Sequence, residues 1–447
     1  MLVCRAQGTY TEKPLAKVSD GCEHPLPVRV KDDTWVALTE ANLVNYARMQ
    51  FEPVGGKASG VVSTLASEVE APLPLKTPWR VVMLGRSPGQ LLERNYLLLN
   101  LNPPCAIEDP SWIKPGKVIR EVTLSTKGGK ACVDFAAKYN LQYVEFDAGW
   151  YGPQGGSDAT TVTPNKDRSS GALDLREVID YADKKGVGIL LYVNRAELRK
   201  QLDEILPLYE RWGVAGIKFG FVASRKADDL QWLHEAVRKA AQHHLVVDIH
   251  DRYRPTGYSR TYPNLLTQEG IAGDETTPST RQSLTILFSR MLAGAGDNTV
   301  CYFTPRVKNQ WNHAHQLAKS VCFYSPLQFL FWYDRPWTGE GQPPHRRGII
   351  SEVPELEFYA HLPTVWDDTE VVSGMIGRHA VLARRSGEEW FVGCMNAGKK
   401  RTLEVPLDFL QEGRDYRAHI YHHVPDVDTR TNVAIDRREV TADTVIN

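Results

Sequence analysis

Residues 188–222 read GILLYVNRAELRKQLDEILPLYERWGVAGIKFGFV. The two ends of this stretch, 188–194 and 216–222, are short apolar runs, which is typical of strands buried on both faces of a sheet. Between them, Leu198, Leu202 and Ile205 recur at helical spacing and predict an amphipathic helix. A buried strand, a helix and a second buried strand indicate a parallel sheet covered by helices.

The same alternation continues on both sides of this stretch. Further apolar runs and amphipathic segments are GGKACVDFAAKYN (128–140), YVEFD (143–147), LQWLHEAVRKAAQHH (230–244), LVVDIH (245–250) and NTVCYF (298–303). Several such units within about 250 residues predict an α/β fold with a central (β/α)8 TIM barrel, and a doubly wound sheet is the alternative. No GxGxxG motif follows these strands, which argues against an NAD-linked reductase.

The chain of 447 residues is long enough for a barrel and two accessory domains. Apolar runs broken by Pro and Gly, such as TWVALTE (34–40) and HAVLARR (379–385), mark β-rich regions before and after the barrel. We therefore expect a β-sandwich-like domain at 1–110, the barrel at 111–367 and an antiparallel β-sandwich at 368–447.

Charge and apolar content exclude two classes of partner. Lys and Arg (53) balance Asp and Glu (54), so no nucleic-acid footprint is expected, and a neutral sugar fits this balance. The longest apolar stretch, 321–332, is interrupted by Ser325 and Pro326 and is too short for a membrane span. We interpret it as a buried barrel helix. Residues 1–19 lack the apolar core of a signal peptide.

In a barrel, the active site forms at the carboxyl ends of the strands. The polar or aromatic residues at or just after such ends are Asp147, Trp150, Asn194, Lys218, His250, Asp251, Glu269 and Glu275. Glycoside hydrolysis needs two carboxyl groups in different protonation states. Asp251, Glu269 and Glu275 lie in one loop-rich stretch, 249–275, where a calcium ion would relieve the repulsion between carboxylates. Solvated loop acids are the alternative interpretation.

At these residues the sequence resembles glycoside hydrolase family 97, a family of α-glucosidases and α-galactosidases. The motifs that carry the resemblance are EANLVNYA (40–47), TPWRVVM (77–83), LNLNPP (99–104), SWIKPGK (111–117), DAGWYG (147–152), RWGVAGIKFGFV (211–222) and RPTGYSRTYPNLLTQEG (254–270). The resemblance implies an N-terminal β-sandwich, a (β/α)8 barrel and a C-terminal β-domain. It also implies an exo-acting enzyme for α-glycosides or oligosaccharides, in a periplasmic or secreted location.

By motif position, the resemblance implies roles for individual residues. Glu275 would be the general acid. The calcium ligands would be Glu40 from the N-terminal domain, Asp251, Glu269 and Glu275. From their positions at the strand ends and in the following loop, we further hypothesise that the substrate-binding residues are Asp147, Trp150, Asn194, Lys218, His250 and Arg254, although each of these also has a purely structural interpretation.

Gly220 departs from the retaining members of the family. They carry an aspartate nucleophile in the motif IKVDF, where this chain has IKFGF (217–221). Glycine cannot attack an anomeric carbon, and the freed space can hold the water that an inverting mechanism requires. We therefore expect an inverting, calcium-dependent α-glucosidase with Asp251, or alternatively Glu197, as the general base. An α-galactosidase and a catalytically silent sugar-binding protein are the other candidates.

Overall fold

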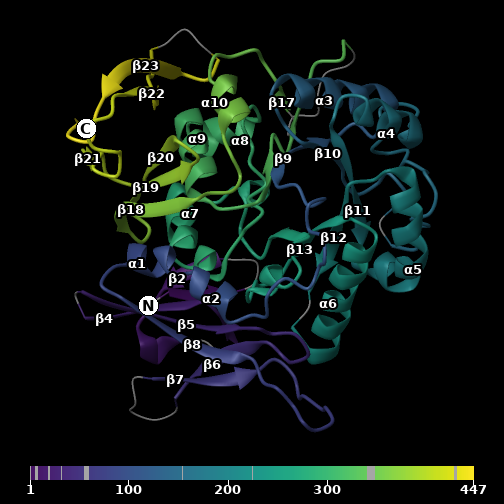
Figure 1. Ribbon diagram of the computed structural model, residues 1–447, viewed down its shortest axis with the longest axis horizontal. Helices are drawn as coiled ribbons and strands as arrows, with labels where there is room; N and C mark the ends of the chain where they lie inside the picture. The colour runs from purple at the N-terminus through teal and green to yellow at the C-terminus, as the bar shows by residue number, and fades with distance from the viewer. Residues whose placement is uncertain are drawn as a thin grey trace.

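The computed structural model describes residues 2–5, 9–18, 21–31, 33–54, 60–153, 155–223, 225–339, 348–426 and 430–447. Three parts follow one another along the chain (Figure 1). They are a group of antiparallel N-terminal sheets, a parallel barrel with helices around it, and an antiparallel C-terminal β-domain. The fold class predicted from the sequence is confirmed.

The N-terminal part contains two antiparallel sheets. The first has the strand order β2-β1-β3-β6-β7 and the second has the order β4-β5-β8. The strands are β1 Leu2–Arg5, β2 Thr9–Glu12, β3 Cys22–Glu23, β4 Leu26–Lys31, β5 Thr34–Ala41, β6 Met49–Pro53, β7 Val61–Leu65 and β8 Trp79–Gly85. In β8, Val81 and Met83 are buried while Val82 and Leu84 are exposed, so only one face of this strand packs on the protein. The short helices α1 (Pro88–Glu93) and α2 (Tyr96–Asn100) lead on toward the barrel.

The barrel sheet is parallel, with the strand order β14-β13-β12-β11-β10-β9-β15. Its strands are β9 Gly116–Glu121, β10 Tyr143–Phe146, β11 Gly188–Asn194, β12 Gly216–Val222, β13 Val246–Asp251, β14 Leu265–Gln268 and β15 Leu327–Leu330. Nearly all residues of β10 to β13 are buried, which explains why these strands appear in the sequence as continuous apolar runs.

An irregular segment, 297–300, lies between β14 and β15 and completes the ring. The Asp297 N–H donates to the Gln268 carbonyl of β14 (3.0 Å), and the Val300 N–H donates to the Phe329 carbonyl of β15 (3.1 Å). The prediction of a strand at 298–303 is therefore wrong. Thr299 has a φ of 48°, a left-handed conformation that interrupts an extended run.

Helices cover the outside of the barrel (Figure 1). They are α3 Thr126–Lys138, α4 Leu175–Asp183, α5 Arg195–Trp212, α6 Ala227–Gln242, α7 Thr280–Leu287, α8 Pro305–Gln310, α9 His313–Cys322 and α10 Leu356–His361. Ser125, Asp174 and Asn194 each begin a helix by accepting an N–H of its first turn. The stretch 321–332, predicted as one helix, instead holds the end of α9 and the strand β15, because Pro326 cannot continue a helix. Among the described helices, none has the length and apolar content to cross a membrane.

The C-terminal part packs against α9. Its strands are β18 Asp368–Met375, β19 His379–Ser386, β20 Glu389–Asn396, β21 Val405–Pro406, β22 Tyr416–His423, β23 Val433–Val440 and β24 Val445–Ile446. At Gly393, in β20, a Cβ atom would stand 2.7 Å from the Ala318 carbonyl oxygen of α9. Glycine therefore permits the sheet β18-β19-β20 to approach the barrel's outer helices closely.

A buried ion cluster joins the N-terminal part to the barrel. The Glu23 carboxylate, on β3, lies 3.8 Å from Arg48, 3.3 Å from Arg225 and 3.4 Å from Arg254. Burial alone would raise the pKa of Glu23, but these guanidinium groups, Arg48 first, lower it. Arg48 also donates to the carbonyl of Arg252, directly after β13 (2.9 Å). The N-terminal part is thus attached close to the rim of the barrel.

Lys319, on α9, and Asp274 form a second buried ion pair, which lies within the barrel part and can be tested by mutation. Both side chains are fully buried and in contact, so Lys319→Met leaves the Asp274 charge buried without its cation. We expect the free energy of unfolding, measured in urea, to fall by about 3–5 kcal/mol. The matched control, Lys308→Met at an exposed position of α8, should change it by less than about 0.5 kcal/mol. Equal stability of the two variants would contradict the buried pair.

Candidate active site

Charged side chains gather at the carboxyl ends of the barrel strands, where parallel strands present their ends to one rim. They are Arg120 on β9, Glu145 and Asp147 on or after β10, Lys218 on β12, Asp248, His250 and Asp251 on β13, and Glu269 after β14. All of these residues except Asp251 are buried. Charged groups at such depth need partners, and the contacts between them define the site.

Glu269 links the ends of β13 and β14. Its Oε2 atom accepts the N–H of Asp251 (2.5 Å) and lies 3.1 Å from His250 Nδ1. Burial alone would lower the pKa of His250, but the Glu269 carboxylate raises it well above its ordinary value. His250 Nε2 also lies 3.5 Å from Asp297. The two ring nitrogens of His250 thus each face a carboxyl group.

Asp251 is the most accessible carboxylate of this group. Its side chain is 20% exposed, and its Oδ2 lies 3.8 Å from His250 Nδ1. Burial alone would raise the pKa of Asp251, but the hydrogen bond and charge of His250 lower it. The Asp251 carboxylate is thus ionised and reaches solvent. This combination suits a general base.

Glu275 approaches the same point from a short 3-10 helix, η3 (Asp274–Thr276). Its N–H donates to Thr299 Oγ1 (3.3 Å), and Arg306 donates to its carbonyl. The neighbouring Asp274 is fixed by the buried Lys319. The structure thus brings Glu275 to His250 and Glu269, as the predicted general acid requires.

His250, Glu269 and Glu275 could hold a metal ion, since one ligand atom from each lies within 4.8 Å of the others. Burial raises the pKa of Glu269, His250 opposes this effect, and the Glu275 and Asp251 carboxylates add to it. A cation between the carboxylates would lower the pKa of Glu269 again, because it stabilises the ionised form. Calcium prefers oxygen ligands, so the two glutamates fit it better than the imidazole does.

The predicted ligand Glu40 is engaged elsewhere. Its carboxylate lies 3.1 Å from His24 Nε2, accepts the N–H of Met49 (3.0 Å) and accepts Arg80 Nη1 (2.7 Å). Burial alone would raise the pKa of Glu40, but His24 and the other donors lower it. Its oxygens are therefore already satisfied within the N-terminal part, and it is not among the grouped ligand atoms described above.

Lys218 lies deeper in the barrel than a sugar-binding role requires. Its Nζ is 3.7 Å from Asp248 and 3.6 Å from Asp297, and it stands 4.0 Å from the centre of the Trp332 ring. Burial alone would lower the pKa of Lys218, but Asp297 and the other carboxylates raise it. Burial and the Asp297 charge raise the pKa of Asp248. Lys218 thus serves first to neutralise two buried acids.

Asp147 and Trp150 have different surroundings, although both were predicted to line a sugar subsite. Asp147 pairs with Arg120 (3.2 Å), whose guanidinium lies over the Trp332 ring. Trp150 is fully buried in the main core, and its Nε1 donates to the Tyr192 carbonyl (2.8 Å). The placement of Trp150 does not support the stacking role, because no face of its ring is open.

Three more predicted residues lie outside the central group. Glu197, in the first turn of α5, accepts the N–H of Gly156 (2.8 Å) and faces Lys200 (3.3 Å). Asn194 caps the same helix. Arg254 belongs to the Glu23 cluster and donates to the Gly270 carbonyl. Each therefore has a structural role in the described contacts.

Gly220 does not leave an open space at the end of β12. A Cβ atom at this position would overlap with the ring and hydroxyl of Tyr192, on the neighbouring strand β11. The prediction that the missing side chain frees room there is wrong for this position. Tyr192 fills it.

Four residues that shape the site were not found from the sequence: Arg120, Tyr192, Asp297 and Trp332. Arg120 and Tyr192 sit within strands rather than at their ends, and Asp297 belongs to the irregular segment beside β14. Trp332 stacks on the His250 ring at 6.2 Å. Tyr192 lies two residues before Asn194, the last residue of its strand. Because side chains alternate between the two faces of a strand, Tyr192 and Asn194 point to the same side, and this could have been predicted from the sequence.

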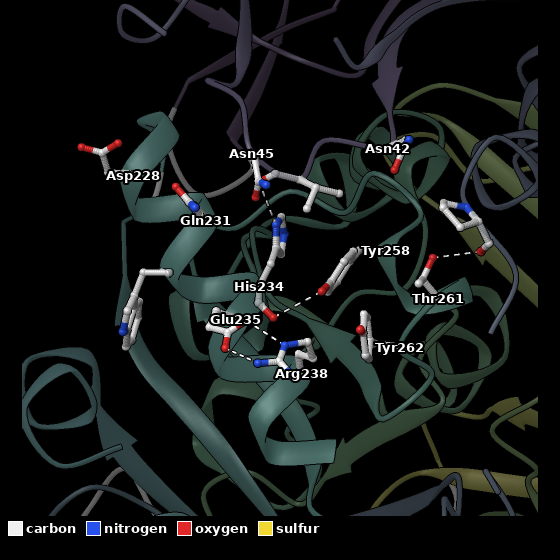
Figure 2. A pocket seen from close by; sticks show the side chains of 13 residues that line it. Asn42, Asn45, Asp228, Gln231, His234, Glu235, Arg238, Tyr258, Thr261 and Tyr262 are labelled. Atoms are coloured by element: carbon white, nitrogen blue, oxygen red, sulfur yellow. Dashed lines mark hydrogen bonds and ion pairs between the residues drawn. The ribbon is translucent and has the colours of Figure 1, made fainter. Parts of the chain in front are cut away.

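A cavity of about 660 Å³ lies apart from this rim, between residues 42–45, helix α6 and residues 258–262. Figure 2 shows Glu235 and Arg238 paired on α6, and Tyr258 and Tyr262 opposite them. The cavity borders the outside of α6 rather than the strand ends. It is therefore separate from the candidate active site.

Two of the curated relatives of this chain are named as α-galactosidases. The probable retaining α-galactosidase of Streptomyces bingchenggensis is 34% identical over 344 residues, covering 74% of this chain and 51% of that protein. The retaining α-galactosidase of Bacteroides thetaiotaomicron is 28% identical, covering 93% of this chain and 68% of that protein. The chain thus spans about half the length of the first relative and about two thirds of the second.

A solved structure supports the fold. A glycoside hydrolase family 97 enzyme from Pseudoalteromonas sp. strain K8, in complex with acarbose, matches with a TM-score of 0.83 at 24% identity, covering 100% of this chain and 76% of that one. Three family descriptions also match in chain order: glycosyl-hydrolase 97 N-terminal (3–104), glycoside hydrolase 97 (114–271) and glycosyl-hydrolase 97 C-terminal, oligomerisation (365–447). Together they extend over most of the sequence, and the chain belongs to glycoside hydrolase family 97.

Proposed function

We propose that this protein hydrolyses terminal α-galactosides, with α-glucosides as the second substrate class. The observation that carries the proposal is the meeting of Asp251 and Glu275 beside His250 and Glu269 at the strand ends. Both relatives described above are named as retaining α-galactosidases, which supports the galactoside. This choice reverses the order expected from the sequence, where the α-glucosidase came first.

In the proposed reaction, Glu275 gives its proton to the glycosidic oxygen and Asp251 takes a proton from the attacking water. Position 220 carries no carboxylate, which supports a single displacement and hence inversion. The two relatives are named as retaining enzymes and give inversion no support. The inverting mechanism therefore rests on the residues of this chain alone.

We also propose calcium as the bound ion, held by Glu269 with Asp251 and His250 beside it, while Glu275 faces the ion and keeps the proton that it donates. Such an ion would orient sugar hydroxyls and stabilise developing negative charge. Glu40 would join only if its contacts to His24 and Arg80 were exchanged for the ion. The argument for the ion is that ligand atoms of His250, Glu269 and Glu275 lie within 4.8 Å of one another.

A catalytically silent sugar-binding protein is the second candidate. The observation that favours it is the Tyr192 ring at position 220, where retaining members of the family carry their nucleophile. A silent protein would bind galactosides without releasing sugar. The assay below separates the two functions.

The first experiment follows the hydrolysis of p-nitrophenyl α-galactoside and α-glucoside by proton NMR. We expect β-galactose to appear first from the wild type. Glu275→Gln and Asp251→Asn should each lower kcat at least about 100-fold, because each removes a proton-transfer group.

Glu197→Gln tests the alternative base in the same assay. Loss of activity in this variant, with Asp251→Asn still active, would exclude Asp251 as the base. If α-galactose appears first, the single displacement is wrong. Sugar binding without product would favour the silent protein.

Calcium dependence forms a separate prediction. We expect EDTA to lower both activity and Tm, and added Ca²⁺ to restore them, because an ion that binds only the native state stabilises it. Glu269→Gln should abolish the Ca²⁺-induced rise in Tm. Glu40→Gln should keep that rise, because in the wild type the Glu40 carboxylate contacts His24 and Arg80 and does not bind the ion. No effect of Ca²⁺ on the wild-type Tm would exclude the ion.

A further inference from the structure

The side chain of Tyr192 occupies the place that position 220 leaves empty. β11 and β12 are parallel neighbours, with Tyr192 paired to Lys218 and Asn194 paired to Gly220. The Tyr192 ring extends along the sheet toward Gly220, where any Cβ atom would overlap with its Cε2, Cζ and hydroxyl atoms. Because the aromatic ring is rigid, this placement of Tyr192 requires glycine at position 220.

The hydroxyl of Tyr192 has no hydrogen-bond partner among the described residues, although the residue is only 4% exposed. An unpaired buried hydroxyl costs about 1–3 kcal/mol. A native protein keeps such a group where a water or ligand supplies the missing bond. The Tyr192 hydroxyl is therefore open to a hydrogen bond from a water or a ligand.

The charges around this hydroxyl define its chemistry. Burial raises the pKa of Tyr192, and the carboxylates of Asp147, Asp251 and Glu145 raise it further. Tyr192 is consequently a neutral phenol, and the Asp251 carboxylate is among the charged groups that act on it. The phenol can accept a hydrogen bond from water while Asp251 accepts another.

We propose that Tyr192 is a positioning residue that orients the attacking water in place of a side chain at position 220. This inference rests on the proposed single displacement. The water donates one hydrogen bond to Asp251 and the other to the Tyr192 hydroxyl, which leaves a lone pair directed at the anomeric carbon. As the new C–O bond forms, the water proton passes to Asp251. The glycosidic C–O bond breaks, and Glu275 protonates the leaving oxygen.

Tyr192→Phe is the first test, because it removes the hydroxyl and keeps the ring. We expect kcat on the better of the two p-nitrophenyl glycosides to fall about 10- to 100-fold, with KM changed less than about threefold. The Tm should stay level or rise, since an unpaired buried hydroxyl is lost. Tyr359→Phe is the matched control. Tyr359, in α10, is also buried, its ring packs against Tyr302 and Phe331, and the loss of its hydroxyl should leave kcat unchanged.

The outcomes separate this inference from the proposed function. An active wild type with unchanged kcat in Tyr192→Phe overturns the role of Tyr192 and leaves the proposed function intact. An inactive wild type overturns both. A fall in kcat together with a matching fall in Tm would mark a structural role and would also overturn the inference.

A second test does not depend on activity. Gly220→Asp alone should lower the Tm by several degrees or prevent folding, because its side chain overlaps with the Tyr192 ring. Adding Tyr192→Ala to Gly220→Asp should recover much of that loss, a non-additive effect expected of residues in contact. Additive effects of the two changes on Tm would show that the ring does not occupy position 220. In the active double variant, the first sugar anomer should change from β to α.

Discussion

The carboxylate of Glu269 is the point on which the site depends. By accepting the Asp251 N–H, it holds a residue whose φ of 75° lies in the left-handed region. That conformation costs an ordinary side chain about 1 kcal/mol or more, and the charged hydrogen bond offsets the cost. The side chains of His250 and Asp251, at the end of β13, therefore point in different directions. The ring stays buried against Glu269, and the carboxylate of Asp251 reaches solvent.

Below this rim, one layer of the barrel interior is charged, and an apolar cluster that includes Leu190 and Val246 lies alongside it. Lys218 lies between Asp248 and Asp297, and Trp332 covers the cations of both Lys218 and Arg120. Removing one member of such a group leaves an uncompensated charge in a dry interior. Lys218 and Asp147, which the sequence suggested as substrate ligands, therefore pair with other buried charges. Few charged groups of the rim remain to contact a substrate.

The sequence predicts best those strands that are buried on both faces. The strands β10 to β13 were found because both of their faces are buried, so that they appear as apolar runs. β9 was missed because it carries Lys117, Arg120 and Glu121 among its apolar residues, and β14 because it has only four residues. At the site, the grouping of Asp251, Glu269 and Glu275 was anticipated from their short separation in the chain. The surroundings of Glu40 and the reach of Tyr192 depend on contacts between strands, which no local pattern encodes.

The ion cluster around Glu23 limits which N-terminal segments can be recombined with this barrel. Arg225 and Arg254 belong to the barrel, yet the charge that neutralises them is contributed by a strand of the N-terminal sheet. An N-terminal segment recombined from a relative without an acid at this place would leave the buried Arg254 and the partly exposed Arg225 without this carboxylate. Shuffling at this boundary is thus constrained by electrostatics as well as by shape, and a successful chimera must carry the acid and the arginines together.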